Sequence, residues 1–388
     1  MKIVFLSVWF SDRMGYIENC LPKALAKLGN EVHVISSTAQ VYYNEPNYDA
    51  IYKPYLGDRI QAEGSSSVDG FTLHRLPFGT IQGKIYIKKL GKKIKEIDPD
   101  VVQSLDAFSF LSFQGTYYKL FHGYKYFTAN HIVASVFPLY QASSIAKRFS
   151  FWVTRTIPGR AIALLTSRCY PATIDALHIA VNYYGVPLKK AKLAPLGVDT
   201  DIFSPNRIGC MKKEDFGIDS TDILCIYTGR FTEGKNPLLL AKAVEKLVAD
   251  NQPFKALFVG DGPQKDEIKD CNGCFVHDFV PYHELPDFYY MADIGVWPRQ
   301  ESTSMLDATS CGLPIVISDK VQATERVDGN GLTYAENDVD DLVKSLMKLK
   351  DAEFRTLLSK HGIDKIMNNY SWLSIAQERM KDYDQFVK

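Results

Sequence analysis

Two cations, Arg230 and Lys235, stand in the short segment TGRFTEGKNP, between the strand-like run ILCIYT and a helix-like run that begins near Leu238. In a parallel α/β sheet such a loop lies at the carboxyl edge, where ligands bind. A guanidinium binds phosphate as a flat fork and an ammonium binds it as a compact charge, so the two side chains could clamp a diphosphate. The alternative is that both are solvated surface cations.

A second polar group, Glu301-Ser302-Thr303-Ser304, lies between another strand and helix and is followed by Asp307. Glu301 could accept hydrogen bonds from sugar hydroxyls, and the three hydroxyl residues offer amides and hydroxyls at a helix start. Asp307, one turn further, could accept both hydroxyls of a ribose. Taken singly, these residues could also be a helix cap and a surface acid.

The first strand-to-helix junction, Ser11 to Gly15, contains one glycine. A dinucleotide fingerprint needs three, for the tight turn, the approach to the pyrophosphate and helix packing. A nicotinamide enzyme is therefore disfavoured. Gly15 still allows the backbone to approach an anion at the helix start. A helix-start glycine that binds no ligand is an equally good interpretation of the sequence.

The elements that must position these residues alternate between strand and helix in two series. In the first, KIVFLSVW and EVHVIS flank a helix over Ile17–Leu28, which is a βαβ unit and implies a parallel sheet. The apolar spacing from Ile87 to Ile97 predicts one helical stripe. In the second series, ILCIYT, KALFV, IGVWP and PIVIS alternate with helices. Two α/β series joined near residues 195–205 predict two Rossmann-like domains.

Length and composition describe an ordinary globular chain of two domains, with 388 residues, 46% hydrophobic and 23% charged. These values exclude a disordered, collagen-like or coiled-coil chain. The sequence contains no run of about 18 apolar residues and therefore predicts no membrane span. The segment MKIVFLSVWF is typical of a first strand rather than a signal peptide. Seven scattered cysteines indicate a reducing, cytoplasmic setting, and the Cys271–Cys274 pair lacks a second pair for zinc.

The zero net charge hides an asymmetry: residues 1–199 carry 23 Lys+Arg and 14 Asp+Glu, and the remainder carries 22 and 31. No acidic residue occurs between Asp106 and Asp175. The first half should therefore face an anionic partner, with nucleic acid, phospholipid and a phosphate-bearing acceptor as candidates. Cations mixed with aromatics over 147–160, and lysines around the 87–97 stripe, favour an anionic membrane surface. For the lysines, a solvated helix face is the alternative.

In order and spacing, these segments resemble the retaining, nucleotide-sugar-dependent glycosyltransferases of glycosyltransferase family four, which have the GT-B fold. The segments that carry the resemblance are GYIENCLPKALAKLGNEVHVIS, YYGVPLKKAKLAPLGVDTDIF, TGRFTEGKNP, VGDGP, LDATSCGLPIVIS and YSWLSIAQERM. The resemblance implies two facing Rossmann-like domains: residues 1–198 on the acceptor side and 199–370 on the donor side. It also implies a terminal helix, 371–388, that crosses back to the first domain.

The resemblance assigns roles to the residues above. Arg230 and Lys235 would hold the donor pyrophosphate, Asp307 would take the place of the family's second glutamate on the ribose, and Glu301 would be the first, on the donor sugar. The family typically has seven residues between these acids and this chain has five. Ser302-Thr303-Ser304 replaces the usual Gly-Phe-Gly.

Two further positions follow from the resemblance. FTANHIV is similar to the strand end that carries the family's active-site histidine, so His131 would contact the donor sugar near the reacting centre. A satisfied core histidine is the alternative. Phe279-Val280-Pro281 matches the loop whose backbone borders the nucleotide base.

The implied activity is transfer of a hexose-type sugar from a UDP- or GDP-sugar to a saccharide or lipid-linked acceptor, in surface polysaccharide or glycolipid assembly. The family's mechanism is front-face attack, in which the leaving phosphate helps to deprotonate the acceptor. We expect no cofactor, no metal and no nucleic-acid partner, because Asp199-Thr200-Asp201 has metal-motif spacing but lies in hinge sequence. We expect a cytoplasmic protein, peripheral at the inner membrane face.

Other functions remain open. GT-B architecture also serves phosphorylases and sugar-nucleotide epimerases, since fold does not determine function. No lysine is positioned for a pyridoxal cofactor, which disfavours a phosphorylase. The altered acid motif could instead mark a catalytically inactive homologue that binds a sugar nucleotide or a partner without turnover.

Overall fold

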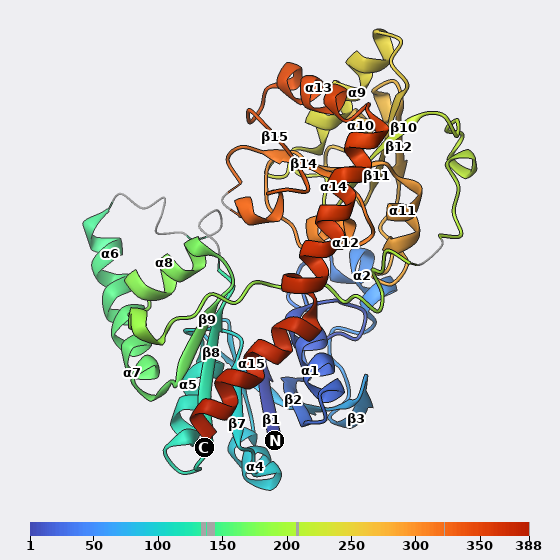
Figure 1. The fold of residues 1–388 in the computed structure, drawn as a ribbon. Coiled ribbons are helices and arrows are strands. Elements are labelled where there is room, and N and C mark those ends of the chain that lie inside the picture. The colour runs from blue at the N-terminus through green and yellow to red at the C-terminus, as the bar shows by residue number, and fades with distance from the viewer. Residues whose placement is uncertain (133–136, 138–143, 207–208, 322, 388) are drawn as a thin grey trace. The chain divides into compact units, whose positions relative to one another are not determined.

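The computed structural model describes residues 1–132, 137, 144–206, 209–321 and 323–387, which form two compact units (Figure 1). The first contains Met1–Leu196 and Trp372–Lys388, and the second contains Gly197–Ser371. These divisions lie within two residues of the predicted boundaries at 198/199 and 370/371. Each unit has its own sheet and helices, so the predicted α/β class with two Rossmann-like domains is confirmed.

The first unit is built on a seven-stranded sheet of order β3-β4-β2-β1-β7-β8-β9. Only β3 runs antiparallel to its neighbour. The strands are β1 (Lys2–Ser7), β2 (Glu31–Ser37), β3 (Gly64–Val68), β4 (Phe71–Leu76), β7 (Val101–Ser104), β8 (Lys125–Asn130) and β9 (Arg168–Pro171). The continuous apolar run of β1 is buried on both faces, as expected for a central parallel strand.

The remaining elements of the first unit cover this sheet or extend from it. The longer helices are α1 (Ile17–Lys27), α4 (Leu90–Ile97), α5 (Phe110–Lys119), α6 (Ile145–Phe151), α7 (Ile157–Leu165) and α8 (Ile174–Asn182). The unit also contains two short helices, α2 (Tyr48–Ile51) and α3 (Lys53–Leu56), a hairpin of β5 (Phe78–Ile81) with β6 (Lys84–Ile87), and a π-helical segment, Trp152–Thr156, between α6 and α7. No helix in the described ranges is both long and apolar enough to cross a bilayer.

The predicted single helical stripe from Ile87 to Ile97 is wrong in its first turn. Ile87 ends β6, and α4 begins only at Leu90. Lys89, between them, has a left-handed backbone (φ 60°), which a continuous helix cannot contain. Ile87 and Leu90 still pack in one buried cluster with Ile94 and Ile97, so the spacing indicated burial correctly but not helix length.

The second unit has a six-stranded parallel sheet of order β12-β11-β10-β13-β14-β15. Its strands are β10 (Ile223–Thr228), β11 (Phe254–Val259), β12 (Cys274–His277), β13 (Ile294–Trp297), β14 (Ile315–Ser318) and β15 (Gly331–Tyr334). Its helices are α9 (Pro237–Ala249), α10 (Lys265–Asp270), α11 (Leu285–Met291), α12 (Ser304–Ser310), α13 (Val339–Lys348) and α14 (Ala352–Lys365). Strand order reverses between β10 and β13, and ligands bind beside such a switch point.

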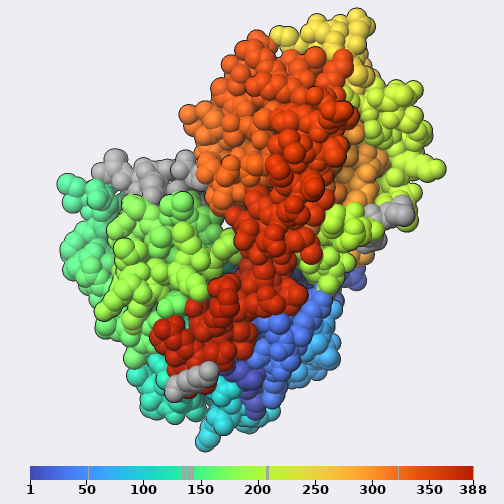
Figure 2. All heavy atoms as spheres, viewed as in Figure 1, coloured from blue at the N-terminus to red at the C-terminus, as the bar shows by residue number. Residues whose placement is uncertain are grey.

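The last helix, α15 (Trp372–Val387), packs on the first unit, as predicted for the terminal helix. It lies beside α1, and its surface position is visible in Figure 2. Arg379 donates a hydrogen bond to Oε1 of Gln103 (2.8 Å) and stacks 3.3 Å from the ring centroid of Tyr170. Buried Asp382 pairs with Arg168 (2.5 Å) and Lys192 (2.9 Å). These contacts hold the end of the chain against β7 and β9.

Replacing Asp382 with alanine should destabilise the first unit, because Arg168 and Lys192 would lose their shared carboxylate. We expect a loss of about 2 kcal/mol, between the values for buried and solvent-screened pairs. Urea unfolding of the first unit measures it. Asp384→Ala, an exposed acid on the same helix, is the control, and equal effects of both variants would contradict the prediction.

Candidate functional site

Arg230 and Lys235 lie in the loop between β10 and α9, on the carboxyl side of the switch point. Arg230 is exposed and Lys235 is half-buried. Tyr227 donates a hydrogen bond to the carbonyl of Arg230 (3.0 Å). Asn236, with a left-handed backbone, ends the loop and starts α9. The loop therefore presents two cations from a fixed backbone.

The loop after β10 is packed backbone to backbone against the loop after β11. A Cβ on Gly260 would lie 2.0 Å from the carbonyl oxygen of Gly229, so no side chain fits there. Phe231 also donates its amide hydrogen to the carbonyl of Asp261 (2.8 Å). The GDG turn that follows β11 therefore supports the cation-bearing loop directly.

Glu301 joins the two cations from the neighbouring loop, between β13 and α12. Burial lowers the pKa of Lys235 and the charge of Arg230 lowers it further, whereas the charge of Glu301 opposes both effects. Arg299 donates a hydrogen bond to the carbonyl of Glu233 (3.3 Å) and so links the two loops. The structure thus brings the loop of Arg230 and Lys235 beside the loop of Glu301, which the sequence analysis selected as a separate group.

Ser302, Thr303 and Ser304 lead into α12, which begins at Ser304 as predicted. Ser302 and Ser304 are half-buried and Thr303 is exposed. The amide of Ser304 donates to Oγ of Ser302 (3.4 Å). The carbonyl of Ser302 accepts a 2.7 Å hydrogen bond from Nη1 of Arg326, a residue that the sequence analysis did not select.

Asp307 lies inside the unit, 4% exposed, on the first turn of α12. Burial, together with the charge of Asp199, raises the pKa of Asp307 well above its ordinary range. Asp199 is itself buried, and its carboxylate accepts the amide hydrogen of Asp201 (3.1 Å). The Asp-Thr-Asp spacing is therefore used in a turn. Ribose binding by Asp307 stays a prediction.

The other selected residues lie elsewhere. Val280 is buried in the core of the second unit, beside exposed Phe279. Gly15 and His131 belong to the first unit: Gly15 precedes α1, and His131 follows β8. Neither ring nitrogen of His131 has a hydrogen-bond partner in the described part of the chain, although both are buried. Burial lowers the pKa of His131 to about 4, so its imidazole is neutral at pH 7.

Two carboxyl groups of the first unit were missed by the sequence analysis. Glu18 lies in the first turn of α1 and Asp106 just after β7, so both stand at the carboxyl edge of the sheet. Burial raises the pKa of Glu18 to about 7 and that of Asp106 to about 6. For Asp106 the available signal was its position just after β7, whereas residues 8–16 separate Glu18 from the end of β1.

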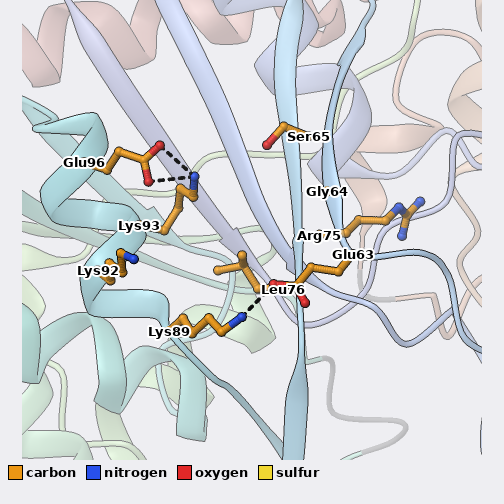
Figure 3. Close-up of a pocket in the computed structure, with 9 residues that line it drawn as sticks. All are labelled: Glu63, Gly64, Ser65, Arg75, Leu76, Lys89, Lys92, Lys93 and Glu96. Carbon is orange, nitrogen blue, oxygen red and sulfur yellow. Dashed lines mark hydrogen bonds and ion pairs between the residues drawn. The ribbon is translucent and has the colours of Figure 1, made fainter.

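A cavity of about 240 Å³ lies between α4 and the β3–β4 edge of the first unit (Figure 3). Lys89 pairs there with Glu63 (3.0 Å), and Lys93 pairs with Glu96 (2.9 Å). The side chain of Arg75 points away from the lysines. Two of the lysines predicted to face an anionic surface are thus already neutralised by carboxylates.

The buried carboxyl group of Asp307 predicts a pH dependence of stability. Its pKa is raised on folding, so the native state keeps a proton that the unfolded state loses above about pH 4. Stability of the second unit should therefore fall as the pH rises from 4. Asp307→Asn has no carboxyl group to titrate, so the variant should be more stable to unfolding than the unmodified protein by about 1 kcal/mol or more at pH 8.

Urea unfolding at pH 5 and pH 8 measures the effect. Asp266→Asn, an exposed acid of the same unit, serves as the control. An unchanged pH slope in Asp307→Asn would contradict the assignment of a neutral carboxyl group.

Comparison with known proteins agrees with this architecture. Residues 222–351 match the family "Glycosyl transferases group 1". An Escherichia coli UDP-Gal:alpha-D-GlcNAc-diphosphoundecaprenol alpha-1,3-galactosyltransferase is 26% identical over 215 residues, which are 50% of this chain and 54% of that protein. A D-inositol 3-phosphate glycosyltransferase of Stackebrandtia nassauensis is 24% identical over 61% of this chain and 58% of its own length. The chain thus spans about half the length of these curated relatives.

Among solved structures, Anabaena HepE in complex with UDP superposes with a TM-score of 0.71 at 13% identity, covering 100% of both chains. A glycosyltransferase from Rickettsia africae gives 0.69 at 14% identity, covering 100% of this chain and 98% of the other. At such identities the likeness establishes the fold. The predicted GT-B fold is confirmed, and residues 222–351 match the group 1 glycosyltransferases, in agreement with the predicted resemblance.

Proposed function

We propose that the protein is a retaining glycosyltransferase. It moves a hexose-type sugar from a UDP- or GDP-sugar to a saccharide or lipid-linked acceptor, in surface polysaccharide or glycolipid assembly. The observation that carries the proposal is the position of Arg230, Lys235 and Glu301 on two hydrogen-bonded loops beside the switch point of the second sheet. The names of the E. coli relative, with its UDP-Gal donor, and of HepE, solved with UDP, support a nucleotide-sugar donor.

The proposed transfer is a single exchange of bonds at the anomeric carbon. The bond to the β-phosphate oxygen breaks and its electron pair stays on that oxygen. The acceptor oxygen bonds to the same face of the carbon, and its proton passes to the departing diphosphate. Arg230 and Lys235 would stabilise the charge that develops on the leaving group, and Glu301 would orient the donor sugar. Neither a metal nor a carboxylate nucleophile has a step in this proposal.

A thermal-shift screen with UDP, GDP and ADP, and with their common sugar conjugates, tests the donor site. One nucleotide series should stabilise the protein by about 2.7 kcal/mol at a concentration of 100 Kd, which is roughly 5–10 °C in Tm. Arg230→Ala should abolish this shift and lower turnover about 100-fold, because the leaving diphosphate loses one charge-assisted contact.

Other outcomes of the screen would contradict parts of the proposal. A full shift with full activity in Arg230→Ala would contradict the assigned role. A shift without turnover on any acceptor would favour the inactive homologue, and a flat response to all nucleotides would contradict donor binding. A strict requirement for a divalent ion, lost with chelator, would contradict the metal-free mechanism.

We also propose that the first unit associates with an anionic membrane through α5, α6 and α7. Large apolar side chains are unusually exposed there, including Phe113 (52%), Phe121 (66%), Phe149 (64%) and Leu164 (75%). Exposed Lys147 and Arg148 flank them, and the sequence has no acidic residue from 107 to 174. Exposed apolar area beside unopposed cations suits an anionic interface.

Sedimentation with phosphatidylglycerol-containing vesicles at low salt tests this surface. The unmodified protein should co-sediment, and Phe149→Ser with Trp152→Ser should weaken partition about tenfold, because two exposed aromatic anchors are lost. Ile60→Ser, an exposed aliphatic residue outside the segment (52%), is the control. No sedimentation of the unmodified protein would contradict membrane association.

A further inference from the structure

Arg326 is a buried cation of the second unit that the proposed chemistry has not used. It ends a short 3-10 turn, Thr324–Arg326, in the segment after β14, and it is 6% exposed. Its Nη1 donates to the carbonyl of Ser302 (2.7 Å), the one hydrogen bond of its guanidinium within the described ranges. A buried guanidinium is unfavourable unless a negative charge balances it.

No carboxylate of the described residues lies within 4.0 Å of this guanidinium. Burial lowers the pKa of Arg326, and the charges of Glu301, Glu325 and Asp307 act against that effect from a distance. Of these three acids, Asp307 is itself held towards its neutral form. The positive charge of Arg326 is therefore incompletely balanced inside the unit.

The fold places the segment that carries Arg326 at the same sheet edge as the loop of the other two cations. Strand β14 pairs with β13, and β13 pairs with β10, all parallel, so the segments that follow them emerge at one edge of the sheet. Burial and the charge of Arg230 lower the pKa of Lys235, and the charge of Arg326 lowers it further. Three cations and one carboxylate thus lie on segments that leave the same edge, and hydrogen bonds join the segment of Arg326 to the Glu301 loop and that loop to the Arg230 loop.

Hydrogen bonds from α14 also hold the backbone around Arg326 in place. Nζ of Lys365, on α14, donates to the carbonyls of Glu325 (2.8 Å) and Asp328 (2.8 Å) and to Oδ1 of Asn330. Asn330 in turn donates to Thr309 of α12 (3.2 Å). Positioning a charged group in this way is what favours binding of an anion without later rearrangement.

The number of negative charges on the candidate ligands indicates which anion three cations would bind. The diphosphate of an intact nucleotide sugar carries two negative charges, which Arg230 and Lys235 match. A released nucleoside diphosphate carries about three at neutral pH, because its terminal phosphate has a second pKa near 6. We propose that Arg326 is a third cation of the donor site, which binds the diphosphate while anchoring the Ser302 loop. This inference rests on the proposed donor site.

Isothermal titration with inorganic pyrophosphate, without divalent ions, tests Arg326 independently of the nucleotide base. Arg326→Met should weaken pyrophosphate binding about 10- to 100-fold, the effect of one charge-assisted contact. Arg326→Lys, which keeps the charge, should bind several-fold better than Arg326→Met. Binding by Arg326→Met should also depend less steeply on salt, which loss of a loop anchor alone would not cause.

Arg355→Met is the matched control, since Arg355 donates to the carbonyls of Leu349 and Lys350 in the same unit. It should bind pyrophosphate within about twofold of the unmodified protein, well under the loss expected for a charge-assisted contact. Unchanged binding in Arg326→Met, with binding lost in Arg230→Ala, would overturn this inference and leave the donor site standing. Equal losses in Arg326→Met and Arg326→Lys, or in Arg355→Met, would also overturn it. Absence of binding by the unmodified protein would overturn the donor site itself.

Discussion

The parallel pairing of β10, β13 and β14 is the constraint on which the candidate site depends. Parallel strands end at the same edge, so loops far apart in sequence are forced together there. The pairing brings the loop of Arg230 and Lys235 beside the loop of Glu301, and Arg326 is hydrogen-bonded to Ser302 of the second loop. Gly260 adds a second constraint, since its backbone contacts Gly229 where no Cβ fits. Together these contacts fix the direction in which the cationic loop faces.

Desolvation then gives these groups their electrostatic character. Lys235, Arg326 and Asp307 are each shifted first by burial and only second by neighbouring charges, so each has a pKa displaced toward its neutral form. A site that holds charges out of water at a cost in stability is prepared for a ligand of opposite charge. An incoming diphosphate would offset that cost, so folding and ligand binding are coupled at this edge.

The first unit has buried titratable groups at its sheet edge and exposed apolar side chains on its helices. His131 has two buried nitrogens without partners in the described part of the chain, and burial raises the pKa of Glu18 to about 7 and that of Asp106 to about 6. All three lie in segments that lead away from the carboxyl edge of one sheet, after β1, β7 and β8. Apolar side chains on α5 to α7 are exposed beside cations, in a stretch of sequence, 107–174, that contains no acidic residue. These features suit an acceptor with hydroxyl groups and an anionic carrier or surface, which is how we interpret the basic half of the chain.

Sequence alone determined the alternation of strands and helices, the two Rossmann-like series and the loops that carry Arg230, Lys235 and Glu301. Those follow from local apolar periodicity and from turn residues at strand ends. Tertiary structure decided the features that a periodic sequence pattern cannot predict. Lys89 interrupts the Ile87–Ile97 stripe through one backbone angle, Asp307 turns inward rather than toward solvent, and Arg326 reaches Ser302 from 24 positions away. Burial and contacts between distant loops depend on strand order, which no local pattern encodes.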